Sequence, residues 1–293
     1  MFKNRLLLFM LAGCQYLCAQ QIVFLGNLQD AGAPQFNCDK SCCLVERPNE
    51  FVASIGVYSE GEEALLFDAT PDFSYQASFL QKQSKTKLSG VFLTHAHMGH
   101  YTGLMHIGRE ASNERSLPVY AMPRMANFLE TNGPWDQLVR LNNIELKRLS
   151  ESENLKTISV TPIKVPHRDE YSETVGYLIK GTNKTAFYLP DIDKWNVWEQ
   201  SIIELIQSID YAIIDGTFLA EGELERPMSE IPHPFISETI ALLESLPKTE
   251  KNKVWFTHFN HTNPVRDKNH PTRLKLEKEG YHFAEFAQEI SLN

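Results

Sequence analysis

A short apolar stretch at residues 90–94 leads directly into a segment that holds three of the chain's ten histidines: His95, His97 and His100. Such a stretch is typical of a strand buried on both faces of a sheet. Side chains at the end of a buried strand are held by a rigid scaffold, while the loop that carries them stays open to a substrate. Since neutral imidazole is the commonest metal ligand near pH 7, the segment predicts a metal site at this strand end.

Three further residues with metal-binding side chains follow strand-like runs. His167 comes after the run at 158–165, Asp191 after 186–189 and His258 after 254–257. One such residue alone is more often a capping or core residue. Together with the histidine segment, these endings predict one site built at the ends of several strands.

The rest of the chain alternates between strand-like and helix-like segments, without an internal repeat or a low-complexity linker. Further strands are expected at 22–25, 52–58, 64–67, 117–121, 144–149, 175–180 and 211–214. Helices are expected at 73–87, 101–111, 123–130, 195–206, 236–246 and 272–279. This order favours a single α/β domain at residues 20–293, with helices flanking sheets.

The composition restricts the class of partner. Hydrophobic residues make up 42% of the chain and charged residues 22%, which is ordinary for a globular protein and excludes a disordered chain. The formal net charge is −9, whereas duplex nucleic acids are bound mainly through a surplus of Lys and Arg. We therefore expect a small-molecule substrate and no nucleic-acid partner, and the oligomeric state stays open.

The order of the strand-end residues resembles the metallo-β-lactamase-fold superfamily. That family carries an H-x-H-x-D-H motif, then a distant His, a distant Asp and a final His. All of these except the motif Asp are present in order: His95, His97, His100, His167, Asp191 and His258. The resemblance covers about residues 21–293 and implies the four-layer αβ/βα sandwich of this family.

The resemblance also implies a ligand set. In the family a first metal ion is bound by three histidines, which match His95, His97 and His167. A second ion is bound by the motif Asp and by the residues that match His100 and His258, and the residue that matches Asp191 bridges the two ions. Asp68 matches a structural Asp near the site. The implied cofactor is zinc, as one or two ions, with iron or manganese as alternatives.

A narrower resemblance is to the branch of this family that contains pyrroloquinoline quinone biosynthesis protein B. It rests on five stretches of the chain: Phe24-Leu25-Gly26, Pro34-Gln35-Phe36-Asn37-Cys38, Ala69-Thr70-Pro71-Asp72, Asp215-Gly216-Thr217 and His258-Phe259-Asn260-His261-Thr262-Asn263-Pro264.

One position departs from the family motif. The place of the motif Asp is taken by Gly99, which has no side chain to bind a metal. The second ion then loses a carboxylate, unless His261 or Asp169 supplies a replacement. We therefore expect the second ion to bind more weakly than the first, and a carboxylate introduced at position 99 to tighten it.

The expected activity is hydrolysis of an ester, lactam or phosphodiester-like substrate by a metal-bound hydroxide, because zinc lowers the pKa of bound water from about 15.7 to about 7. Asp191 is the candidate to orient the water or accept its proton, and His233 is a candidate to reach the substrate. Asp68, Thr94 and Asp215 are candidates to orient the imidazoles. An iron-dependent oxygenase and a non-catalytic binding or carrier protein are the alternatives.

The first residues differ from the rest. Lys3 and Arg5 precede an apolar run at 6–12, which is too short to span a bilayer and is typical of a secretory signal. Cleavage after residue 19 would leave a soluble exported or periplasmic protein. The lipobox-like segment Leu11-Ala12-Gly13-Cys14 would instead remove residues 1–13 and place lipid on Cys14, anchoring the protein to a membrane surface. An uncleaved strand in a cytosolic protein is the third alternative.

Three more cysteines lie close together after the first expected strand: Cys38, Cys42 and Cys43. One disulfide with a free thiol, a structural zinc held by three thiolates and a fourth ligand, and plain buried thiols all stay open.

Overall fold

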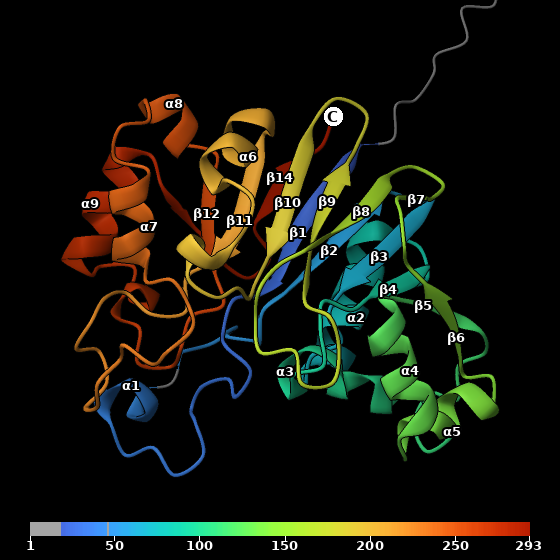
Figure 1. The fold of residues 1–293 in the computed structure, drawn as a ribbon. Helices are drawn as coiled ribbons and strands as arrows, with labels where there is room; N and C mark the ends of the chain where they lie inside the picture. The colour runs from blue at the N-terminus through green and yellow to red at the C-terminus, as the bar shows by residue number, and fades with distance from the viewer. Residues whose placement is uncertain (1–18, 46) are drawn as a thin grey trace, which may run out of the picture.

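The computed structural model describes residues 19–45 and 47–293, and its core is a pair of seven-stranded sheets that face each other. Helices cover the outer face of each sheet, so the layers follow the order helix, sheet, sheet, helix (Figure 1). The four-layer αβ/βα sandwich expected from the sequence is confirmed. The expected signal segment lies outside the described residues.

The first sheet has the strand order β14-β1-β2-β3-β4-β5-β6. Its strands are β1 (Gln20–Gly26), β2 (Ser54–Ser59), β3 (Glu63–Phe67), β4 (Gly90–Phe92), β5 (Leu117–Ala121), β6 (Ile144–Arg148) and β14 (Glu289–Ser291). β14 pairs antiparallel with β1, so a strand near the end of the chain forms the edge of this sheet next to the strand that begins the described region.

The second sheet has the order β13-β12-β11-β10-β9-β8-β7. Its strands are β7 (Glu153–Asn154), β8 (Ser159–Lys164), β9 (Val175–Lys180), β10 (Thr185–Leu189), β11 (Tyr211–Asp215), β12 (Val254–Thr257) and β13 (His282–Phe283).

The helices and 3-10 helices connect these strands and cover the sheets. They are α1 (Ser41–Leu44), α2 (Phe73–Ser84), α3 (Met98–Tyr101), η1 (Thr102–Ile107), α4 (Pro123–Thr131), α5 (Trp135–Arg140), η2 (Trp195–Val197), α6 (Ile202–Ser208), α7 (Ile236–Leu242), α8 (Lys248–Lys251), η3 (Pro264–Arg266) and α9 (Pro271–Glu279). None of the described helices is long and apolar enough to cross a membrane.

The alternation of side chains along the strands separates three apolar layers. In β1, Val23 and Leu25 face the helical side and pack in the same cluster as Leu80 of α2. Ile22 and Phe24 point the opposite way, into the core between the two sheets. This is the two-residue period of a strand, and burying both faces explains why β1 is apolar at every one of these positions.

Two expected helices are broken in the structure, and two more end early, because the helix expected at 73–87 ends at Ser84 and the one expected at 236–246 ends at Leu242. The segment expected as one helix at 195–206 divides into η2 and α6, because the Trp195 Nε1 donates to Thr239 and the Trp198 Nε1 donates to the Lys164 carbonyl, which anchors the indoles to different elements. The helix expected at 101–111 becomes α3 and η1 and ends at Ile107. Gly103 of η1 lies so close to the Thr70 carbonyl that a Cβ there would be 2.1 Å from its oxygen.

The parallel pairs within the sheets decide where the loops meet. β3 runs parallel to β4, and β10, β11 and β12 run parallel to one another. The carboxyl ends of parallel strands lie at one edge of a sheet, where ligand sites of α/β proteins form. The segments after these strands therefore converge.

Candidate metal centre

Six of the residues singled out by the sequence converge at the carboxyl edges of the two sheets. Their ligand atoms form two groups, each within 4.8 Å: His95, His97 and His167 in one, and His100, Asp191 and His258 with Asp30 in the other. The first three come from the loop after β4 and the loop after β8, which belong to different sheets.

Asp191 lies between the two groups. Its Oδ2 is 3.0 Å from His100 Nε2 and 3.2 Å from His258 Nε2. The same carboxylate approaches the first group, with 3.6 Å between Oδ2 and His95 Nε2 and 3.6 Å between Oδ1 and His167 Nε2. One carboxylate therefore faces both groups, as a bridging ligand must.

The donor atoms fit a metal ion. The Nε2 atoms of His95 and His167 are buried and make no hydrogen bond within the part of the chain that the structure describes. An unpartnered buried ring nitrogen is unfavourable, because it loses its bonds to water without replacing them. Imidazole and carboxylate donors suit zinc, which binds three or four such ligands.

The opposite ring nitrogens have protein partners. The Nδ1 atoms of four histidines lie near a hydroxyl or carboxylate oxygen: His95 with Thr94 at 2.9 Å, His100 with Asp68 at 2.7 Å, His167 with Asp193 at 3.0 Å and His258 with Thr217 at 2.9 Å. Such partners fix the orientation of a ligating imidazole and the position of its proton.

Asp68 organises the loop after β4. Its fully buried carboxylate accepts hydrogen bonds from the backbone N–H of Thr94 at 2.8 Å and from the Thr94 hydroxyl at 2.9 Å, and it also contacts His100. Asp68 and His258 have backbone φ angles of 67° and 63°. Residues other than Gly seldom adopt this left-handed region. Backbone strain of this kind concentrates at functional sites.

The electrostatics divide the histidines of the centre into two kinds and favour the charged form of Asp191. Burial lowers the pKa of His95 well below its usual value, and burial also lowers the pKa of His97. Burial opposes the charged form of Asp191, but His258 and His100 hold its pKa well below the usual range. His100 differs, because Asp68, Asp191 and Asp30 outweigh the effect of burial and hold its pKa well above the usual value.

His233 reaches the same centre from the loop before α7. Its Nδ1 is 2.8 Å from Asp215 Oδ2 and 3.3 Å from Asp191 Oδ1. Burial opposes its charged form, but Asp215 raises the pKa of His233 to about 9. Asp215 also accepts from the hydroxyl of Thr217, which contacts His258, so Asp215 supports one side of the centre.

Asp30 is part of the centre and was absent from the predicted site. Its Oδ1 is 3.0 Å from His100 Nε2 and 3.3 Å from His258 Nε2. Asp30 lies four residues after the end of β1, whereas Asp191 lies two residues after the end of β10, so the pattern of a polar residue close behind an apolar run does not single out Asp30.

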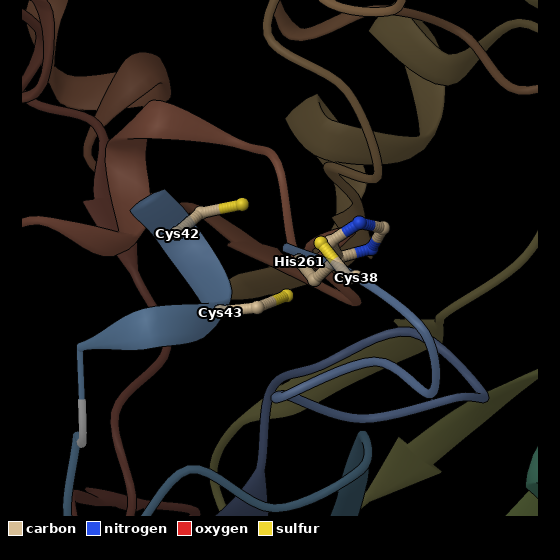
Figure 2. A group of neighbouring side chains, drawn as sticks. All are labelled: Cys38, Cys42, Cys43 and His261. Atoms are coloured by element: carbon tan, nitrogen blue, oxygen red, sulfur yellow. The ribbon is translucent and has the colours of Figure 1, made fainter. Parts of the chain in front are cut away.

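The two proposed replacements for the motif Asp lie elsewhere. Asp169 is exposed and pairs with Arg124 at 3.3 Å. His261 lies with the three described cysteines, and the four ligand atoms of Cys38, Cys42, Cys43 and His261 are all within 4.8 Å of one another. Figure 2 shows the three sulfurs and the imidazole ring turned toward a common space. The sulfurs are not joined by a disulfide.

A pocket of about 420 Å³ adjoins the metal centre. Its walls include His233, Arg168, which follows His167 in the sequence, and Gln29, which precedes Asp30. Arg226 also lines the pocket, together with Glu230. Both arginines are exposed, and within the described residues neither guanidinium has a hydrogen-bond or ion-pair partner.

Known proteins are similar to this chain in sequence. Coenzyme PQQ synthesis protein B of Nitrosococcus oceani is 26% identical, over 92% of this chain and 98% of that protein. The protein of the same name from Acinetobacter baumannii is also 26% identical, over 92% of this chain and 99% of its own length.

Among solved structures, Zn²⁺-bound PqqB from Methylobacterium extorquens superposes with a TM-score of 0.74 at 22% identity, covering 92% of this chain and 99% of that one. A diphosphatase from the PhnP family gives a TM-score of 0.67 at 22% identity, covering 93% and 96%. Human tRNase Z, short form, gives 0.58 at 15% identity, covering 93% and 99%. These likenesses show the fold.

The family model described as the beta-lactamase superfamily domain matches residues 63–259, a range that contains every strand-end residue predicted from the sequence. With the four-layer fold and the paired ligand groups, this match shows that the chain belongs to the beta-lactamase superfamily.

Proposed function

We propose that this protein is a zinc-dependent hydrolase of an ester, lactam or phosphodiester-like small molecule. The observation that carries the proposal is the position of Asp191, whose carboxylate faces both ligand groups from 3.0 to 3.6 Å. One group of three histidines and a second group with carboxylates, sharing one acid, is the donor arrangement of a two-ion hydrolytic centre.

Zinc bound at such a centre supplies a water whose pKa falls from about 15.7 to about 7, and it polarises a carbonyl or phosphoryl oxygen. Residues of the chain orient the water and accept its proton. Asp191 is placed to orient the water or to accept its proton, and His233, held by Asp215 at 2.8 Å, faces both Asp191 and the adjoining pocket.

The pocket supports a substrate that carries negative charge. Guanidinium groups bind phosphate and carboxylate groups through paired hydrogen bonds, and two exposed arginines, Arg168 and Arg226, line the pocket. Among the three substrate classes, this favours a phosphodiester-like molecule or an ester with an anionic group. Two relatives in fold, a diphosphatase and tRNase Z, carry names that denote phosphoryl chemistry.

The proposal is tested with the full chain loaded with zinc. Bis(p-nitrophenyl) phosphate, p-nitrophenyl acetate and nitrocefin serve as substrates, before and after dipicolinate removes the metal. We expect turnover of at least one substrate, its loss with the chelator, and its return with zinc. His97→Ala should lose at least one ion per chain, whereas His106→Ala, outside the ligand groups, should retain all of them.

Two outcomes overturn hydrolysis and identify the alternatives. Turnover that requires iron and consumes O₂ would indicate an oxygenase. Full metal content without turnover of any substrate would indicate a binding or carrier protein. Unchanged metal in His97→Ala would remove the metal assignment itself.

We further propose that Cys38, Cys42, Cys43 and His261 hold a structural zinc. Three thiolates and one imidazole form a closed tetrahedral ligand set. The His261 Nδ1 is 2.9 Å from Asn260 Oδ1, and Cys43 Sγ accepts from the Gln35 amide at 3.4 Å, so both side chains are oriented by neighbours.

A thiol count separates the alternatives for these cysteines. If the cysteines hold a structural zinc, one ion per chain remains in His97→Ala and is released by a mercurial reagent. Denatured, unreduced protein then shows three free thiols from these cysteines. One free thiol would indicate a disulfide. Three free thiols without the extra zinc would indicate plain buried thiols.

We also propose that the protein is exported. The basis is the sequence alone: Lys3 and Arg5 before the apolar run at 6–12. Mass spectrometry of the native N-terminus decides the form, since a start at residue 20 means a soluble exported protein and a start at lipid-modified Cys14 means a membrane-anchored one. An intact Met1 in the cytosolic fraction would contradict export.

A further inference from the structure

Position 99 has no room for the carboxylate that the family motif places there. An ideal Cβ built on Gly99 would lie 2.5 Å from the Cα of Asp30 and 2.5 Å from its Oδ1. The side chain of Asp30 therefore occupies the space into which an acidic residue at position 99 would project.

The Asp30 carboxylate also contacts the ligands that the motif Asp would accompany. Its Oδ1 is 3.0 Å from His100 Nε2 and 3.3 Å from His258 Nε2, and its candidate ligand atom lies within 4.8 Å of those of His100, Asp191 and His258. His100 and His258 match the ligands of the second ion in the family. The carboxylate of Asp30 therefore lies at the second metal site and not at the first.

The backbone holds Asp30 at this point by joining the two sheets. Leu28, two residues after the end of β1, forms parallel bridges with both Val52 and Phe259. The amide of Gln29 donates to the Phe259 carbonyl at 2.9 Å, and the amide of Phe259 donates to the Asn27 carbonyl at 2.6 Å. Phe259 follows His258, so the segment that carries Asp30 is paired with the segment that carries a second-ion ligand.

We infer that Asp30 is the missing carboxylate ligand of the second metal ion, supplied from the loop after β1 in place of the residue at position 99. With Asp30 and Asp191 the second site has two carboxylates and two imidazoles, which balances the charge of a divalent ion and gives four ligands. The second site is then complete. This inference rests on the proposed two-ion centre.

The test measures metal binding and does not depend on turnover. Zinc content and affinity are determined by mass spectrometry of the metal and by competition with a chromogenic chelator, on wild type, Asp30→Asn, Asp30→Ala and Asp169→Asn. Asp169→Asn is the matched control, because it removes an exposed acid that lies outside the ligand groups.

We expect Asp30→Ala to lose one ion per chain, and Asp30→Asn to bind that ion more than about 10-fold more weakly, the loss that even an outer-shell partner can cause. Asp169→Asn should match wild type. Equal zinc content and affinity in wild type and Asp30→Ala would overturn the inference while leaving the first site, and hydrolysis through it, intact. Wild type that binds no ion at the histidine groups would instead overturn the proposed function.

Gly99→Asp provides a second, opposite test. If Asp30 fills the site, an Asp at position 99 collides with the Cα and carboxylate of Asp30 and must weaken the second ion. If the site lacks a carboxylate, Gly99→Asp must tighten it. Tighter binding in this variant would therefore overturn the role of Asp30.

Discussion

At the scale of single residues, the centre depends on groups that orient the ligands. Asp68 is fully buried, accepts from the Thr94 amide and contacts the ring of His100. The pairing resembles a general feature of metal sites, in which a carboxylate receives the second ring N–H of a ligating histidine.

Asp68→Asn should weaken binding of the second ion by roughly 10- to 100-fold, because an amide cannot accept from both the Thr94 N–H and the His100 ring as a carboxylate does. Competition with a chelator measures the change. Asp210→Asn is the control. Asp210 accepts from the Thr185 amide at the start of β10, which is the end of that strand away from the metal centre. Equal affinities in the two variants would contradict the orienting role of Asp68.

Arg226→Gln should raise KM for an anionic substrate by about 10-fold or more and leave kcat nearly unchanged, because a hydrogen bond to a charged group contributes about 1.5–3 kcal/mol. The measurement compares an anionic substrate with a neutral one of the same reactive group. Arg115→Gln, on an exposed loop lining a different pocket, is the control. An equal change for the neutral substrate would show that Arg226 does not recognise charge.

At the scale of elements, the break between η2 and α6 shows how contacts with distant segments override a local helical pattern. The apolar spacing over residues 195–206 is compatible with one helix, but the two indoles bond to α7 and to β8. Ser201 then begins α6 by accepting from the Glu204 amide at 3.3 Å.

Ser201→Ala should lower the free energy of unfolding by about 1 kcal/mol, the usual loss for an N-cap hydroxyl. Urea denaturation followed by circular dichroism gives the value. Ser78→Ala, at an exposed position inside α2, is the control and should be neutral or slightly stabilising, because Ala favours helix. A similar loss in both variants would mean that the cap of α6 is unimportant.

At the scale of the whole molecule, the metal centre links the two sheets. The loops after β1, β3 and β4 come from the first sheet, and those after β8, β10 and β12 come from the second. The proposed cysteine site ties the same halves, because Cys38 follows Asp30 on one segment and His261 follows His258 on the other. Metal binding should therefore stabilise the fold as a unit.

Zinc should raise the Tm by roughly 5 °C or more at a free concentration 100 times its Kd, because that excess adds about 2.7 kcal/mol and each kcal/mol moves the Tm of a chain this large by about 2–4 °C. Calorimetry with and without dipicolinate measures the shift. His97→Ala should show a smaller shift, since it removes a ligand of the first ion. A Tm that is independent of zinc in wild type would contradict a centre that links the sheets.

The sequence by itself determined the fold class and most of the strand-end residues, because both depend on short-range patterns. An apolar run predicts a buried strand, and the residue after it lies at the sheet edge whatever the rest of the chain does. His95, His167, Asp191 and His258 follow this rule.

Tertiary structure decided which residues meet. The motif places an acid at position 99, yet the space there is taken by Asp30, which lies in another loop and was brought close by the bridges of Leu28. His261, expected near the second ion, lies with the cysteines because the segment after β12 turns toward α1. Contacts between segments far apart in the chain depend on how the two sheets pack, and no local pattern of residues encodes that packing.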